Sequence, residues 1–257
     1  MNYRNLTNSV MEIVDDIGMS LLDLQGKAVK SPTSRKDFVT NADLKSHRWF
    51  LRELKKLTPK IQIFSEEDGK EILATKKSCW IIDPLDGTIN YFHQLESWGV
   101  SVALVSEGQT QLGVVFFPAL GELIGATYGE NLYAGSSAKN LCVRDDADLS
   151  QAQIWTDHIK GPADPVIDIF GKLTRHTLCP QVRLCATYSL LNVAFGNIAG
   201  YVHPAPKPED IAAACLIVEN AGGKVTDIQG NPWTPFSKSI VATNGLLHDQ
   251  LLSVLNN

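Results

Sequence analysis

The chain has 257 residues, of which 44% are apolar and 20% are charged, and its net charge at pH 7 is −5. This apolar content can bury a large core and excludes an intrinsically disordered chain. The acidic balance argues against a protein that coats a nucleic-acid polymer or binds a membrane through basic residues. The five cysteines lack CxxC spacing, which is typical of reduced thiols and predicts a cytoplasmic protein.

The first segment with a clear periodicity is 1–27. Its apolar residues recur at helical spacing and are Leu6, Val10, Ile13, Val14, Ile17, Leu21 and Leu22. Asp15 and Asp16 interrupt the apolar positions, so the pattern predicts a packed amphipathic helix. A signal peptide or a membrane span would need a longer uninterrupted apolar run.

The rest of the N-terminal half is predicted to contain one helix followed by strands. The helix covers Asn41–Leu57, with Thr40 as its N-cap and Asp43 at the third position of a capping box. Strands are predicted at 61–64, 79–82, 99–106, 111–117, 122–128 and 131–134. Because these strands follow one another without intervening helices, we expect a largely antiparallel sheet.

In the C-terminal half, predicted strands and helices alternate. Strands are expected at 153–156, 200–203, 224–227 and 239–243, and helices at 165–173, 187–198, 208–220 and 248–255. We therefore expect an α/β (α+β) fold, a layered αβαβα sandwich with a mixed, largely antiparallel N-terminal sheet and a second C-terminal sheet. Residues 1–257 are expected to form one catalytic unit, with approximate subdomains 1–145 and 146–257 that meet at a cleft.

The most specific feature of the sequence is the motif at 83–88, Asp-Pro-Leu-Asp-Gly-Thr, which follows the apolar run 80–82. Pro84 favours an extended conformation at Asp83, and Gly87 permits a sharp turn and a close approach to a ligand. The N–H groups that open the next segment are suited to an anion. A divalent metal and a phosphate explain this combination most economically.

Other acidic residues are candidates for the same centre: Asp43, the pair Glu66-Glu67, and Asp210. Each also has a purely structural explanation. Asp43 completes a capping box, the acidic triplet 66–68 reads as a solvated loop, and Asp210 favours the dipole of the helix that it opens. If 83–88 binds metal, however, these acids complete the site, because Mg²⁺ prefers oxygen ligands.

The motifs resemble those of the inositol monophosphatase superfamily of Mg²⁺-dependent, lithium-sensitive phosphatases. The matching segments are 39–43, 66–67, 83–88, 209–214 and 219–223, in the family's order and across nearly the whole chain. Two positions depart from the family pattern. Glu209 stands where the family has Trp, and Ala214 stands where it has Gly.

The resemblance implies two or three bound Mg²⁺ ions. Glu66, Asp83 and the backbone carbonyl of Leu85 would hold the first ion. Asp83, Asp86 and Asp210 would hold the second, with Asp83 bridging the two ions.

The resemblance also implies a mechanism and a mode of assembly. Thr88 and Asp43 would position and deprotonate a metal-activated water that attacks phosphorus directly, with help from Glu67. The backbone amides of Gly87 and Thr88 would bind the phosphate. The family further implies a small phosphorylated substrate and a homodimer.

The leaving alcohol is left open by the sequence. Family members that use inositol phosphate often carry an acid seven positions before the residue that matches Asp210, and here that position is His203. His203 is either an ordinary loop residue or, with Lys207, part of a site for a second phosphate. The candidates are myo-inositol 1-phosphate, fructose 1,6-bisphosphate and 3′-phosphoadenosine 5′-phosphate, with the first preferred on family frequency. His203 and Asp210 are predicted substrate contacts.

Two other functions compete with this prediction. Haloacid-dehalogenase-like phosphatases also carry Asp-Gly-Thr, but one residue separates their two acids, whereas Pro84 and Leu85 separate them here. A non-catalytic homologue would bind metal or a phosphorylated ligand and regulate a partner. The presence of all the predicted metal ligands, Thr88 and Asp43 favours the enzyme.

Overall fold

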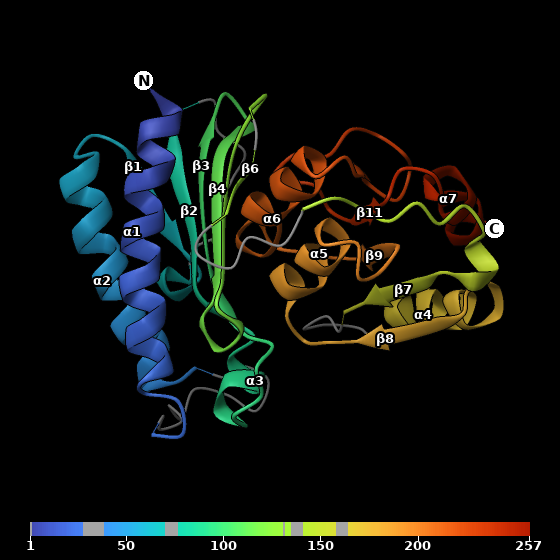
Figure 1. Cartoon of the computed structure of the whole chain (residues 1–257), viewed down its shortest axis with the longest axis horizontal. Coiled ribbons are helices and arrows are strands. Elements are labelled where there is room, and N and C mark those ends of the chain that lie inside the picture. The colour runs from blue at the N-terminus through green and yellow to red at the C-terminus, as the bar shows by residue number, and fades with distance from the viewer. Residues whose placement is uncertain (1, 28–38, 70–76, 131, 135–140, 158–163) are drawn as a thin grey trace.

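The computed structural model describes residues 2–27, 39–69, 77–130, 132–134, 141–157 and 164–257. Within these ranges, two β-sheets alternate with three layers of helices, in the order α, β, α, β, α (Figure 1). The predicted fold class is therefore confirmed. Three buried apolar clusters fill the four interfaces between helical layers and sheets, because one of them covers both faces of the central helical layer.

The first helical layer consists of α1 (Tyr3–Leu22) and α2 (Asn41–Leu57). The predicted apolar face of α1 packs on the first sheet, and α2 begins at the predicted capping box, in which Thr40 and Asp43 bond reciprocally. Within the described ranges, no helix has the length and apolar character needed to cross a membrane.

The first sheet has six strands in the order β1-β2-β3-β4-β5-β6. These are β1 (Gln62–Ser65), β2 (Cys79–Asp86), β3 (Gly99–Ser106), β4 (Gln109–Phe117), β5 (Glu122–Thr127) and β6 (Leu132–Ala134). Only the pair β1–β2 is parallel, which confirms the largely antiparallel prediction. Two strands are followed by short 3₁₀ turns. The turn η1 (Glu66–Asp68) follows β1, and the turn η2 (Pro118–Leu120) follows β4. Position 131, in the last predicted strand, lies outside the described residues.

Strand β2 is longer than the sequence predicts. It runs through the 83–88 motif as far as Asp86, and its register with β3 shifts between Asp83 and Asp86. Such an irregularity tolerates Pro84, which has no N–H to give to a neighbouring strand. A short helix, α3 (Thr88–Phe92), then begins directly after Gly87 (Figure 1). This helix was not predicted, because five residues are too few to show a helical periodicity.

The central layer consists of α5 (Ala186–Ala194) and α6 (Pro208–Asn220), which lie between the two sheets. Helix α6 is apolar on nearly every side because both sheets cover it. Helix α5 ends before the predicted residue 198. Gly196 has a φ of 68°, and a Cβ there would lie 2.7 Å from the carbonyl of Cys142, so the chain leaves the helix at a position that requires glycine.

The second sheet has five strands in the order β10-β11-β9-β7-β8. These are β7 (Gln153–Thr156), β8 (Cys179–Val182), β9 (Gly200–His203), β10 (Lys224–Thr226) and β11 (Ile240–Thr243). Strand β7 is parallel to both β8 and β9, and the other two pairs are antiparallel. The edge strand β8 was not predicted, because its Pro180 is a poor strand signal in a sequence.

The outer layer consists of α4 (Asp164–His176) and α7 (His248–Asn256), which cover the far face of the second sheet. A 3₁₀ turn, η3 (Leu149–Gln151), precedes β7. All five cysteines lie in the described ranges and none forms a disulfide there.

The close contact between β4 and α6 predicts the effect of a small substitution. A Cβ at Gly113 would lie 2.7 Å from the Cα of Ala213, so Gly113→Ala should lower the free energy of unfolding by about 1–3 kcal/mol. Gly171→Ala is the matched control, because it adds the same methyl group on α4 at ordinary contact distances and should stabilise by about 0.5–1 kcal/mol. Urea denaturation measures both, and equal stability of Gly113→Ala and wild type would contradict the packing argument.

Candidate active site

The predicted site residues come from four segments that meet beside the end of β2. Asp43 lies in the first turn of α2, and Glu66 opens η1 directly after β1. Because β1 pairs with β2 in parallel, with Ser65 opposite Ile82, Glu66 is placed beside Asp83. Asp210 lies in the first turn of α6.

Asp83 and Asp86 are buried carboxyls, 2% and 8% exposed. The Leu85 N–H donates to Asp83 Oδ1 at 3.0 Å. Burial raises the pKa of Asp83 well above its usual value, and the charges of Glu66, Asp86 and Asp210 raise it further. These four carboxyls therefore form one electrostatic cluster.

Residues at the start of α5 donate hydrogen bonds to the Asp86 carboxylate. Its Oδ2 accepts hydrogen bonds from the Thr187 N–H at 2.9 Å, the Thr187 hydroxyl at 2.5 Å and the Cys185 thiol at 3.2 Å. Burial raises the pKa of Asp86, and the bonds from Thr187 act in the opposite direction. Sequence reasoning missed both of these partners. The only signal was the position of Thr187 at the predicted start of a helix.

Asp210 also stabilises the start of α6. Its Oδ2 accepts a hydrogen bond from the Lys207 N–H at 2.7 Å, and its charge lies in the first turn of the helix, where the helix dipole favours an acid. Burial raises the pKa of Asp210 well above its usual value, with further contributions from Asp86, Glu66 and Glu209. The same carboxyl therefore belongs to the acidic cluster as well as to the helix cap.

Lys207 also contacts the cluster through its side chain. Its Nζ donates to Glu66 Oε1 at 2.8 Å and lies 3.7 Å from Glu209 Oε1. Considering only the described residues, no three acidic, histidine or cysteine side chains converge closely enough to form a complete metal site. The charges of the four acids influence one another, but each carboxylate accepts a hydrogen bond from a donor of the chain itself.

The donor set nevertheless fits a hard divalent cation. The cluster offers only carboxylate and carbonyl oxygens, which Mg²⁺ prefers over nitrogen or sulfur. Burial and mutual repulsion raise the pKa values of Asp83, Asp86 and Asp210. A cation reverses this effect because it favours the ionised form of each carboxyl. The residues present therefore match the chemistry of a magnesium centre.

Asp43 and Thr88 form a second functional unit beside the cluster. The Thr88 hydroxyl lies 3.0 Å from Asp43 Oδ1 and 3.1 Å from the Leu85 carbonyl oxygen. Burial raises the pKa of Asp43 to about 6, although hydrogen bonds from Thr40 and Thr88 lower it. A carboxyl that titrates near neutral pH is suited to accept a proton during a reaction. Asp43 is thus both a capping residue and a candidate base.

Gly87 occupies a position that only glycine fits. Its φ is 81°, and a Cβ there would lie 2.9 Å from the Ser97 carbonyl oxygen. Glu67 lies in η1 with its side chain half-buried, and its N–H faces the Ser65 hydroxyl at 3.4 Å. The predicted roles of Gly87 in phosphate binding and of Glu67 in catalysis stay predictions.

His203 is a buried residue at the end of β9, with 6% of its surface exposed. The Ala205 N–H donates to its Nδ1 at 3.2 Å, and its ring meets Tyr201 edge to face. Burial lowers the pKa of His203 to about 4, so the imidazole is neutral at pH 7. Its predicted contact with the substrate stays a prediction, but such a contact would involve a neutral ring.

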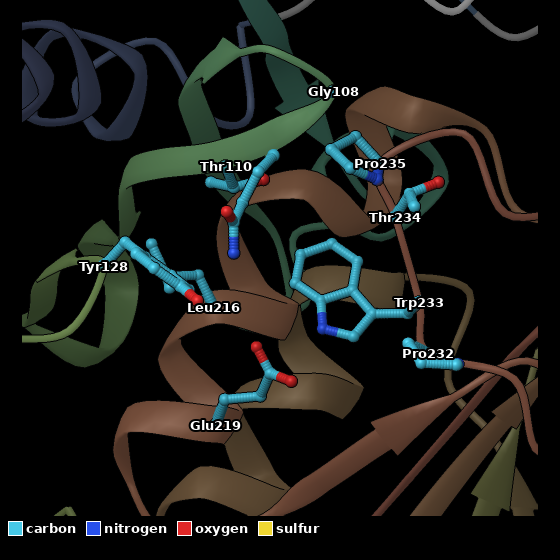
Figure 2. A pocket seen from close by; sticks show the side chains of 10 residues that line it. Gly108, Thr110, Tyr128, Leu216, Glu219, Pro232, Trp233, Thr234 and Pro235 are labelled. Carbon is cyan, nitrogen blue, oxygen red and sulfur yellow. The ribbon is translucent and has the colours of Figure 1, made fainter.

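A separate pocket of about 260 Å³ lies at the other end of α6 from Asp210. Figure 2 shows Glu219 and Trp233 facing one another in this pocket, with Tyr128 and Thr110 on its opposite side. Among the described residues that line it, Glu219 is the only acid. This pocket therefore lacks the clustered carboxylates that characterise the candidate active site.

Comparison with known proteins agrees with the fold. The sequence profile of the inositol monophosphatase family matches residues 4–257, so the chain belongs to this family. A Thermotoga maritima protein described as "Fructose-1,6-bisphosphatase/inositol-1-monophosphatase" is 34% identical over 231 residues, which cover 89% of this chain and 86% of that protein.

Two further relatives show the range of the family. The Escherichia coli protein named "Nus factor SuhB" is 33% identical over 211 residues, which cover 81% of this chain and 78% of that protein. A solved structure of an inositol monophosphatase from Thermotoga maritima aligns with a TM-score of 0.86 at 30% identity, over 100% of this chain and 97% of that one.

The raised pKa of Asp83 predicts a stability change. An acid whose pKa rises on folding stabilises the folded state below its unfolded pKa, and this contribution is lost as the pH rises through the folded pKa. In EDTA at pH 7, Asp83→Asn should therefore raise Tm by about 2–4 °C or more. Asp15→Asn, on the exposed side of α1, is the control. A lower Tm for Asp83→Asn would contradict the role of charge repulsion in the cluster.

Proposed function

We propose that this member of the inositol monophosphatase family is a Mg²⁺-dependent phosphomonoester hydrolase that uses direct attack by water. The observation that carries the proposal is the contact between Thr88 and Asp43 at 3.0 Å. This contact lies beside the buried pair Asp83 and Asp86, so a proton acceptor and a cation-binding cluster share one site.

Five residues of the chain would hold two or three Mg²⁺ ions. Glu66, Asp83 and the Leu85 carbonyl are proposed for one ion, and Asp83, Asp86 and Asp210 for another. When bound, Mg²⁺ would neutralise the charge of the phosphate, lower the pKa of water and stabilise the leaving alkoxide.

The residues of the chain would move the proton and orient the reactants. Thr88 would accept a hydrogen bond from the attacking water while it donates to Asp43, and Asp43 would take the proton, with Glu67 in support. The amides of Gly87 and Thr88, at the start of α3, would orient the phosphate. No residue of the chain becomes phosphorylated in this scheme.

Inositol 1-phosphate is the proposed substrate, and fructose 1,6-bisphosphate and 3′-phosphoadenosine 5′-phosphate are the alternatives. His203 is neutral and Lys207 is paired with Glu66. These two residues therefore do not offer the pair of positive charges that would favour a second phosphate. The names of the relatives, which include both inositol-1-monophosphatase and fructose-1,6-bisphosphatase, support the first two of these substrates.

A phosphate-release screen with these three compounds tests the proposed function. We expect release that requires Mg²⁺, is abolished by EDTA, and is fastest with inositol 1-phosphate. Faster turnover of either bisphosphate would reassign the substrate within the same reaction class. No release from any phosphomonoester would favour the non-catalytic alternative, in which the protein binds metal or a phosphorylated ligand and regulates a partner.

The pKa of Asp43 predicts the pH profile of this activity. A base must be deprotonated, so kcat should rise as the pH rises through about 6 and then level off. Asp43→Asn should lower kcat by roughly 10²–10⁴-fold and remove this rise, without loss of the folded state by circular dichroism. Asp16→Asn, on the exposed side of α1, should leave the profile unchanged. Near-wild-type turnover in Asp43→Asn would rule out Asp43 as the base.

Other properties of the family are proposed for this chain on the same basis. They are inhibition by Li⁺, assembly as a homodimer, a cytoplasmic location, and subdomains divided near residue 145. Each of these stays a prediction.

A further inference from the structure

Lys207 makes two different contacts with the acidic cluster. Its backbone N–H donates to Asp210 Oδ2 at 2.7 Å, and its Nζ donates to Glu66 Oε1 at 2.8 Å. One residue thus joins the start of α6 to the end of β1, although Lys207 and Glu66 are 141 positions apart in the sequence. Both contacts are with acids that are proposed metal ligands.

The surroundings of Lys207 restrict its backbone and place a second acid beside its ammonium group. Pro206 and Pro208 flank it and restrict its backbone, which is extended at φ −92° and ψ 158°. Glu209 is 6% exposed, and its Oε1 lies 3.7 Å from Lys207 Nζ. The lysine therefore stands between two carboxylates, one on each side of the interface between η1 and α6.

This arrangement suggests why a glutamate, rather than the tryptophan of the family pattern, matters at position 209. A tryptophan at 209 would offer no negative charge to a neighbouring ammonium group. Glu209 does, because its Oε1 lies 3.7 Å from Lys207 Nζ.

An ammonium group and a divalent ion compete for the same oxygen. Two cations a few ångströms apart repel one another, although the 47% exposure of the Lys207 side chain lets water screen part of this repulsion. An ion that binds Glu66 through Oε1 must therefore displace the Lys207 ammonium or accept this repulsion. This competition weakens cation binding at Glu66, which contacts the ammonium group of Lys207. Asp210 is less affected, because it contacts the backbone N–H of Lys207.

We propose that Lys207, held by Glu209, is a built-in competitor of the divalent cation at Glu66 and makes this the weakest cation position of the site. The inference rests on the proposed function, because it takes Glu66 to be a metal ligand. It assigns Lys207 a role in setting the metal requirement rather than in contacting the reacting atoms.

Mn²⁺ binding, measured by electron paramagnetic resonance on the full chain, tests the inference without turnover. Lys207→Met removes the charge and keeps the backbone N–H that donates to Asp210, so it should tighten the weakest Mn²⁺ site by about tenfold or more. Lys207→Arg keeps the cation and should bind Mn²⁺ as weakly as wild type. Lys207→Gln, a second neutral variant, should behave like Lys207→Met.

Lys224→Met is the matched control for net charge. Lys224 pairs with Asp249 at 3.0 Å on the surface, so its removal changes the charge of the protein equally but leaves the site intact. Mn²⁺ binding should not change in this variant. If Lys224→Met tightens binding as much as Lys207→Met, the effect is one of net charge and the inference is overturned.

The remaining outcomes separate this inference from the proposed function. Unchanged or weaker Mn²⁺ binding in both Lys207→Met and Lys207→Gln overturns the competitor role. If Asp83→Asn abolishes Mn²⁺ binding in the same assay, the metal site of the proposed function is still supported. If Asp83→Asn binds Mn²⁺ as wild type does, the ion is not in the acidic cluster. The metal site of the proposed function then fails as well.

Discussion

The burial of several carboxyls at one end of β2 is the constraint on which the rest of this structure depends. Asp83 and Asp86 are almost fully enclosed, and with Glu66 and Asp210 they disfavour one another's ionised forms. Such a cluster is costly to a folded protein unless each acid has hydrogen-bond donors or a cation nearby. The chain provides donors from Leu85, Thr187 and Lys207. The cluster is therefore held in place, and its oxygen atoms match the chemistry that a hard divalent cation prefers.

The layered fold explains how these acids and their donors meet. The parallel pairing of β1 with β2 brings Glu66 to Asp83. The central helices, α5 and α6, direct their N-termini toward the same place, with Thr187 bonded to Asp86 and Asp210 in the first turn of α6. Both helices lie between two sheets, so close packing fixes their positions. At Gly113, the approach of β4 to α6 leaves no room for a methyl group.

Much of the fold could be predicted from the sequence, because most elements carry a strong local signal. Helices α2 and α6 and strands β3, β7 and β9 begin and end where capping residues, prolines and apolar runs predict. The failures have different physical origins. Helix α3 is too short for a periodicity, the edge strand β8 contains Pro180, and β2 continues past Ile82 because pairing with β3 outweighs the local effect of Pro84.

The sequence by itself determined the family and the residue types of the candidate site, because the acids, glycines and prolines of its motifs are local features with few other uses in that order. Only the tertiary structure decided which groups meet. Thr187 lies 101 positions from Asp86, and Lys207 lies 141 positions from Glu66, so no local pattern records either contact. Burial, which raises the pKa of Asp43 to about 6 and lowers that of His203 to about 4, likewise depends on packing between distant segments.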